Sequence, residues 1–136
     1  MHAGSDLRRR TIVLDSGLRG GELRRILVHE LFHFVWPRLG NPARRSWGAV
    51  LSAEFAKRAR GDLGWAAESR KAALGPEDPR NRTAAWRAYA CEAFCDTAAY
   101  LWSGVERHPE FTLAASHRST RARWMRNHLG SGRIKL

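Results

Sequence analysis

The chain has 136 residues, a formal net charge of +11 and two cysteines. This length predicts one domain with its own core, spanning residues 1–136. No apolar run reaches the roughly 18 residues of a membrane span, and the first residues lack the apolar segment of a signal peptide. We therefore expect a cytoplasmic protein with no membrane partner. Cys91 and Cys95, one helical turn apart, are expected to be structural thiols rather than a disulfide pair.

The first predicted elements are a short strand at residues 11–15 and a helix over residues 23–36. Gly20-Gly21 marks the approach to this helix, and Pro37 cannot continue it. The helix is apolar on most sides, which predicts that it is buried.

This helix contains His29-Glu30-Leu31-Phe32-His33, an HExxH pattern. Residues i and i+4 share one face of a helix, so His29 and His33 can bind one metal ion while Glu30 stands beside it. The pattern predicts a zinc site with Glu30 as the general base.

The later elements are predicted from capping residues, helix breakers and apolar periodicity. They are helices over 47–60 and 65–74, a polar linker at 76–82, a helix from near Thr83 to before Gly104, a short strand at 111–113, and a final basic helix over 117–129. The six tryptophans are most simply core residues.

A catalytic zinc ion needs a third protein ligand and an open position for water. Leu39 stands where a metzincin has its third histidine, which excludes that arrangement. The remaining candidates are carboxylates and histidines later in the chain: Glu54, Glu68, Glu92, His108, His117 and His128. Glu92 is favoured because Asp96 lies four residues on, on the same helix face. One carboxylate can bind the metal while the other accepts the outer N–H of a ligating histidine.

An HExxH followed by a helical Glu-x-x-x-Asp resembles the gluzincin metallopeptidases, and the single-domain minigluzincins most of all. The resemblance covers about thirty residues in two blocks. It implies that His29, His33 and Glu92 bind zinc, that Glu30 is the general base and that Asp96 orients a ligand. Glu54 lies at a spacing nearer to that of the thermolysin-like enzymes, but Arg58, four residues later, offers no acceptor for a ligand's N–H.

The expected fold is therefore α+β and mainly helical. It is zincin-like, with an active-site helix, a second helix bearing Glu92 and a small N-terminal strand region that lines the substrate cleft. The expected activity is zinc-dependent hydrolysis of peptide bonds, with a peptide or protein as substrate. Donors for the oxyanion are sought among polar side chains of the second half of the chain: Tyr89, Tyr100, His108, His117 and Arg118. His117 is preferred, because Arg118 beside it lies in a segment that can return over the cleft.

Two other functions stay open. One is a DNA-associated or regulatory protease resembling the Spartan-like or ImmA/IrrE families, although the former usually have histidine as third ligand and the latter's Glu-x-x-Ala-Asn-type block is absent. The other is a non-catalytic, zinc-stabilised or metal-free interaction domain, against which an intact Glu30 argues. The arginine excess attracts polyanions, but no nucleic-acid motif accompanies it, so nucleic acid is not the favoured partner.

Overall fold

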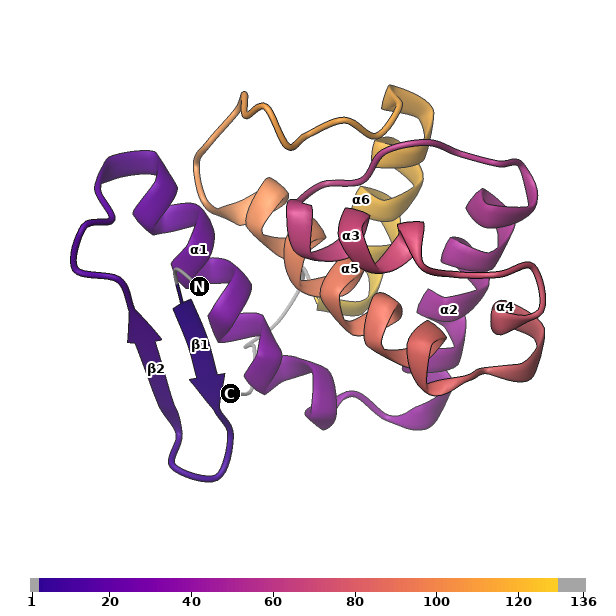
Figure 1. Ribbon diagram of the computed structural model, residues 1–136, viewed down its shortest axis with the longest axis horizontal. Coiled ribbons are helices and arrows are strands. Elements are labelled where there is room, and N and C mark those ends of the chain that lie inside the picture. The colour runs from indigo at the N-terminus through magenta and orange to yellow at the C-terminus, as the bar shows by residue number, and fades with distance from the viewer. Residues whose placement is uncertain (1–2, 130–136) are drawn as a thin grey trace.

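The computed structural model describes residues 3–129 and confirms a mainly helical chain with a small N-terminal sheet (Figure 1). Its elements in chain order are β1 (Ala3–Asp6), β2 (Thr11–Leu14), α1 (Gly20–Val35), a short 3-10 helix η1 (Trp36–Arg38), α2 (Asn41–Ala56), α3 (Trp65–Ala72), α4 (Asp78–Asn81), α5 (Ala84–Trp102) and α6 (Ala115–Leu129). No helix within residues 3–129 combines the length and the apolar character needed to cross a lipid bilayer.

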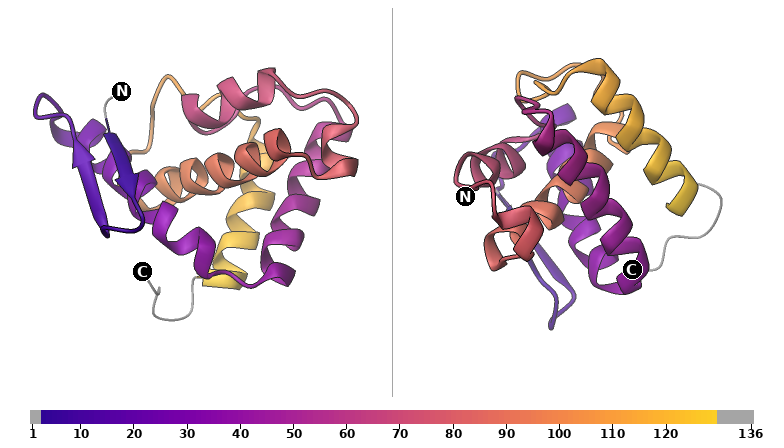
Figure 2. Two further views of the ribbon diagram at one scale, coloured as in Figure 1. Left: turned by 60° about the horizontal axis from the view of Figure 1, so that its bottom comes forward. Right: turned by 90° about the vertical axis from the view of Figure 1, so that its right-hand side faces the viewer.

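Helix α5 lies at the centre of the fold and contacts every other α-helix (Figure 2). Its sequence explains this position, because small residues such as Ala93 and Ala98 are fully buried and let neighbouring helices approach closely. Thr83 caps its start by accepting a hydrogen bond from the Trp86 N–H at 3.2 Å, as predicted.

The two strands form an antiparallel hairpin that packs on α1 at one end of the molecule (Figure 1). Ser5 pairs with Ile12 across it, and Val13 on β2 is exposed. The sequence predicted β2 but not β1, because Ala-Gly-Ser-Asp has neither the β-branched residues nor the alternation that mark a strand.

Three other predicted elements differ from the structure. Helix α2 begins at Asn41 rather than residue 47, because Pro42 occupies its first turn, where proline is well tolerated. The linker predicted at residues 76–82 contains the short helix α4. The strand predicted at residues 111–113 is wrong: the N–H groups of Thr112 and Leu113 both donate to the Asp62 carbonyl, at 2.9 and 3.1 Å, and the segment lies outside the sheet.

The prediction that all tryptophans are core residues holds only in part. Trp47, Trp86 and Trp124 are buried, and Trp47 lies edge-on to Phe94 in the main core. Trp65, in contrast, is 69% exposed, and Trp102 is also exposed. Trp65 is the first residue of α3.

A buried polar cluster joins α6 to the rest of the fold. The guanidinium group of Arg121 is fully buried and donates two hydrogen bonds to Glu54, at 2.9 and 2.7 Å, and two to Asp62, at 2.7 and 3.3 Å. Tyr89 donates to Asp62 Oδ2 at 2.7 Å. Buried charges need such partners, so these contacts fix how α6 packs against α2 and α5.

Candidate metal centre

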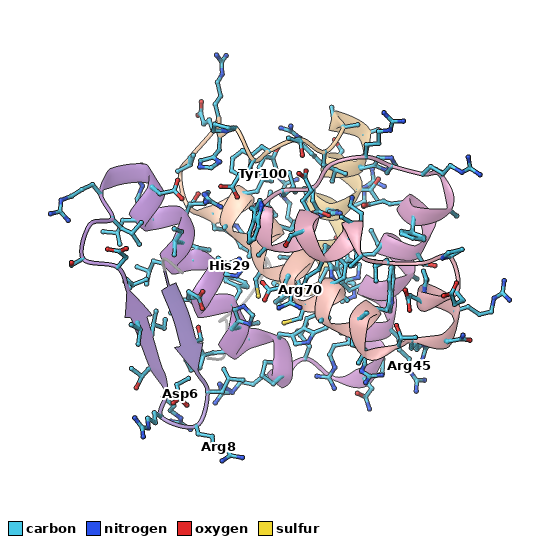
Figure 3. All side chains as sticks on the ribbon, viewed as in Figure 1. Asp6, Arg8, His29, Arg45, Arg70 and Tyr100 are labelled. Atoms are coloured by element: carbon cyan, nitrogen blue, oxygen red, sulfur yellow. The ribbon has the colours of Figure 1, made fainter. Side chains whose placement is uncertain are left out.

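The HExxH residues lie in the second half of α1, and the side chains of His29 and His33 face α5. His29 and Glu30 are buried and His33 is half-buried. Figure 3 labels His29 between the hairpin and the central helices. The helical spacing predicted for the motif brings the two imidazole Nε2 atoms to 3.3 Å from each other.

Helix α5 brings Glu92 to the same point. Glu92 Oε2 lies 3.0 Å from His29 Nε2, and Glu92 Oε1 lies 3.4 Å from His33 Nε2. These three residues form a group of potential ligand atoms that all lie within 4.8 Å of one another. The structure thus brings together the three ligands expected from the sequence, although Glu92 is 59 residues beyond His33.

The spacing of these atoms fits a metal ion. An ion held tetrahedrally through bonds of about 2.0–2.1 Å sets its ligand atoms about 3.3 Å apart. The three distances, 3.3, 3.0 and 3.4 Å, lie close to that value. Moreover, the buried Oε2 of Glu92 has no hydrogen-bond partner among the described residues, although His29 Nε2 is so near. A cation between the three groups would satisfy it.

Without a metal, protons take the place of the cation. Burial opposes the charged form of His29, but the neighbouring carboxylates of Asp96 and Glu92 outweigh burial and raise the pKa of His29 to about 9. Burial is likewise outweighed at His33, where Cys91 and Glu92 raise the pKa to about 10. Burial would raise the pKa of Glu92, but the two imidazoles hold it well below its ordinary value. A metal binds neutral imidazole, so metal and protons compete for this cluster.

Asp96 supports His29 from the side opposite Glu92. Its Oδ1 lies 2.6 Å from His29 Nδ1, and its Oδ2 accepts the Ala67 N–H at 3.0 Å. An N–H on Nδ1 leaves the Nε2 lone pair facing Glu92, which is the tautomer that a metal requires. The backbone passes so close to this carboxylate at Gly64 that any Cβ there would overlap it.

Ser5 contacts the expected general base, which the sequence did not indicate. Its hydroxyl donates to Glu30 Oε2 at 2.5 Å and lies 3.0 Å from the Glu30 carbonyl oxygen. The contact comes from β1, a strand that the sequence pattern missed. A lone serine 25 residues before Glu30 carries no signal that would have revealed it.

The two cysteines are free, as expected, and they border this centre. Cys91 Sγ lies 3.7 Å from His33 Nδ1, on the far side of the ring from Glu92. The hydrogen bond with Cys95 lowers the pKa of Cys91 to about 6, while burial raises that of Cys95. His33, Cys91 and Cys95 form a second group of closely spaced potential ligands that shares His33 with the first.

The alternative carboxylate ligands are engaged elsewhere. Glu54 binds Arg121 through both of its oxygens. Glu68 accepts a hydrogen bond from Thr112 at 2.6 Å. Neither belongs to a group of closely spaced ligand atoms among the described residues.

The alternative histidines also lie apart from His29 and His33. His108 Nε2 lies 2.7 Å from Glu22, near the start of α1. His128 stacks on Trp124 in α6. His117 lies in the first turn of α6, and no contact among the described residues joins it to the metal centre.

Several of the expected oxyanion donors are occupied by other contacts. Tyr89 donates to Asp62, and Arg118 donates to the Leu113 and Phe111 carbonyls at 2.6 Å each. The hydroxyl of Tyr100 has no hydrogen bond to a described residue. The role of His117 stays a prediction.

Comparison with protein-family models, with curated proteins and with solved structures finds nothing that matches this chain.

Proposed function

We propose that this chain is a zinc-dependent peptidase with a zincin-like arrangement of its active-site helix, its Glu-bearing helix and its N-terminal hairpin. One observation carries the proposal. The ligand atoms of His29, His33 and Glu92 are spaced as a tetrahedral zinc ion requires, and the carboxylate of Glu30 directly follows one of these ligands. A purely structural site has no need of that carboxylate.

His29, His33 and Glu92 would hold the ion, which when bound supplies a Lewis acid that polarises the scissile carbonyl and acidifies water. Glu30 accepts the proton of the attacking water and hands it to the leaving amine. Asp96 keeps a proton on His29 Nδ1 and so keeps the ring in its ligating orientation.

The hairpin has two roles in this proposal. Ser5 on β1 fixes the carboxylate of Glu30 by hydrogen bonding. Within the described residues, β1 pairs with β2 on one side only, and its other edge is the one on the side of α1 (Figure 1), where the backbone of an extended peptide could pair with it. Substrate would then lie along the hairpin, beside α1.

The decisive experiment combines cleavage of a mixed peptide library with measurement of zinc content. Glu30→Gln should bind as much zinc as the wild type and keep its circular dichroism spectrum, yet lose cleavage by at least about a hundredfold, because the amide cannot accept the proton. Glu106→Gln, which removes an exposed carboxylate of the loop before α6, is the matched control and should cleave normally.

Other results would support a different function. If the wild type binds zinc but cleaves no peptide, the chain is an interaction domain stabilised by zinc. Cleavage confined to one DNA-bound or regulatory protein would favour the Spartan-like or ImmA/IrrE-like alternative. Wild-type turnover by Glu30→Gln would remove Glu30 from the mechanism.

A further inference from the structure

A cavity of about 440 Å³ lies between α2, α4 and the first half of α5, away from the metal centre. Its lining includes four arginines, Arg44, Arg45, Arg82 and Arg87, and none of the described residues that line it is acidic. Figure 3 labels Arg45 at the lower right of the molecule, whereas His29 lies further to the left, nearer the hairpin. The volume is that of a small-molecule binding site.

None of these arginines forms an ion pair with a described residue. Arg44 donates to the Trp36, Pro37 and Leu39 carbonyls, which holds the turn between α1 and α2 but leaves its charge uncompensated. Arg87 donates to the Arg82 carbonyl at 2.6 Å. The side chains of Arg45 and Arg82 are exposed and have no hydrogen bond within the described chain.

Four uncompensated charges around one concave surface repel one another, and an anion bound between them would relieve that repulsion. Neutral donors are present as well. Asn41 and Ser52 line the cavity, and the indole N–H of Trp86, near Gly48, has no acceptor among the described residues. Guanidinium groups with neutral donors suit an oxyanion that carries several acceptor oxygens.

The basic surface continues beyond this cavity. A second hollow of about 680 Å³ shares Ser52 and Pro79 with the first, and Arg58 and Arg80 line it. Neither arginine pairs with a described carboxylate, in contrast to Lys71 nearby, which lies 3.3 Å from Asp62. A ligand with one cluster of phosphates would fill the first cavity. A nucleic-acid strand, which has successive phosphates, would run along both hollows.

We propose that the arginine cavity between α2, α4 and α5 binds the phosphate groups of a nucleotide or of a nucleic-acid strand. Both sources offer the same chemistry, a phosphate that guanidinium groups bind through paired hydrogen bonds. This site explains part of the +11 charge of the chain and does not depend on the proposed peptidase activity.

The test compares two triple variants that lose the same charge. Arg45→Gln, Arg82→Gln and Arg87→Gln together remove the exposed arginines of the cavity, whereas Arg107→Gln, Arg123→Gln and Arg126→Gln remove exposed arginines elsewhere. Arg44 is left intact because it holds the backbone between α1 and α2. Zinc content and circular dichroism report whether each variant folds. The probes are a fluorescent single-stranded oligonucleotide, ATP without added divalent metal, and inorganic phosphate, each at several salt concentrations.

We expect the triple variant of the cavity to bind whichever of these probes the wild type binds at least about tenfold more weakly than the wild type does. The salt dependence of its binding should also be shallower. The control variant should lose less than about threefold. Tight binding of ATP would identify a nucleotide site, and binding of the oligonucleotide alone would identify a nucleic-acid site. Equal losses in both variants, or no binding of any probe by the wild type, would overturn the proposal, because the charge would then act only as a diffuse field.

Discussion

The hydroxyl of Ser5 lies 2.5 Å from Oε2 of Glu30, so the first strand of the chain contacts the acidic residue of the HExxH motif. A carboxylate on a helix surface rotates among several rotamers unless it is held. The hairpin therefore orients the proposed general base as well as covering α1. This relation gives the first prediction.

Ser5→Ala should lower kcat of peptide cleavage about tenfold, the size expected for loss of one hydrogen bond to a charged group. Zinc content should not change, because Ser5 contacts none of the three ligands. Ser5→Thr retains the hydroxyl and should restore most of the activity. Equal activity of the alanine and wild-type proteins would show that Glu30 needs no help from the hairpin.

Alanine in place of His29, His33 or Glu92 should abolish stoichiometric zinc binding, since each removes one of only three protein ligands. Elemental analysis after dialysis measures this directly. His128→Ala is the matched control, because His128 stacks on Trp124 and belongs to no group of closely spaced ligand atoms among the described residues. Full zinc content in the Glu92 variant would mean that the ion binds elsewhere, the cluster of His33, Cys91 and Cys95 being the first place to look.

Gly64→Ala should weaken zinc affinity about 10- to 100-fold, because its new methyl group would displace the Asp96 carboxylate from His29. Asp96→Ala should have an effect of the same size. Gly48→Ala is the control: its Cβ would meet nothing nearer than 3.9 Å, so the metal dissociation constant should stay as in the wild type. Competition with a chromophoric chelator measures all of these constants.

Arg121→Met should lower the free energy of unfolding by about 3–5 kcal/mol, because it leaves Glu54 buried without a cation and Asp62 with Lys71 alone. Urea denaturation of the metal-free protein measures the loss. The exposed neighbour Arg123→Met serves as control and should change stability by less than about 0.5 kcal/mol.

The effect of Arg121→Met should also depend on pH. Burial would raise the pKa of Asp62, but the charge of Arg121 outweighs it and holds this pKa below its ordinary value. A lowered pKa in the folded state adds stability above the unfolded-state pKa of about 3.9, and that stability is lost as pH falls through the folded value. The difference in the free energy of unfolding between wild type and variant should therefore become smaller below about pH 4. A difference in unfolding free energy that stays constant from pH 7 to pH 3 would show that the ionised Asp62 does not contribute to the effect of Arg121.

The parts of the site that depend on local spacing could be predicted from the sequence. His29 and His33 share a helix face wherever that helix lies, and the same holds for Glu92 and Asp96. That these two pairs of residues lie next to each other depends on how the two helices pack in the tertiary structure. The small residues of α5, such as Ala93 and Ala98, are the sequence feature that permits it, because they let α1 approach closely.

What could not be predicted arises from contacts between distant segments that have no pattern of their own. Ser5 reaches Glu30 because β1, which has no strand pattern in its sequence, pairs with β2. Arg121 sits in a basic helix among arginines that look alike in sequence, yet it alone in α6 binds two buried carboxylates. Gly64 reads as an ordinary loop glycine, and only the nearby Asp96 explains why a side chain would not fit there.

The position of Arg121 along the chain bears on when the protein can take up metal during synthesis. Every proposed ligand, from His29 to Glu92, leaves the ribosome before Arg121 does. Until then, Glu54 and Asp62 have no guanidinium partner, and the packing of α2 against α5, the helix that carries Glu92, cannot be completed. Metal loading of the nascent chain should therefore begin only after α6 has emerged, and a stalled chain that ends before residue 121 should not retain zinc.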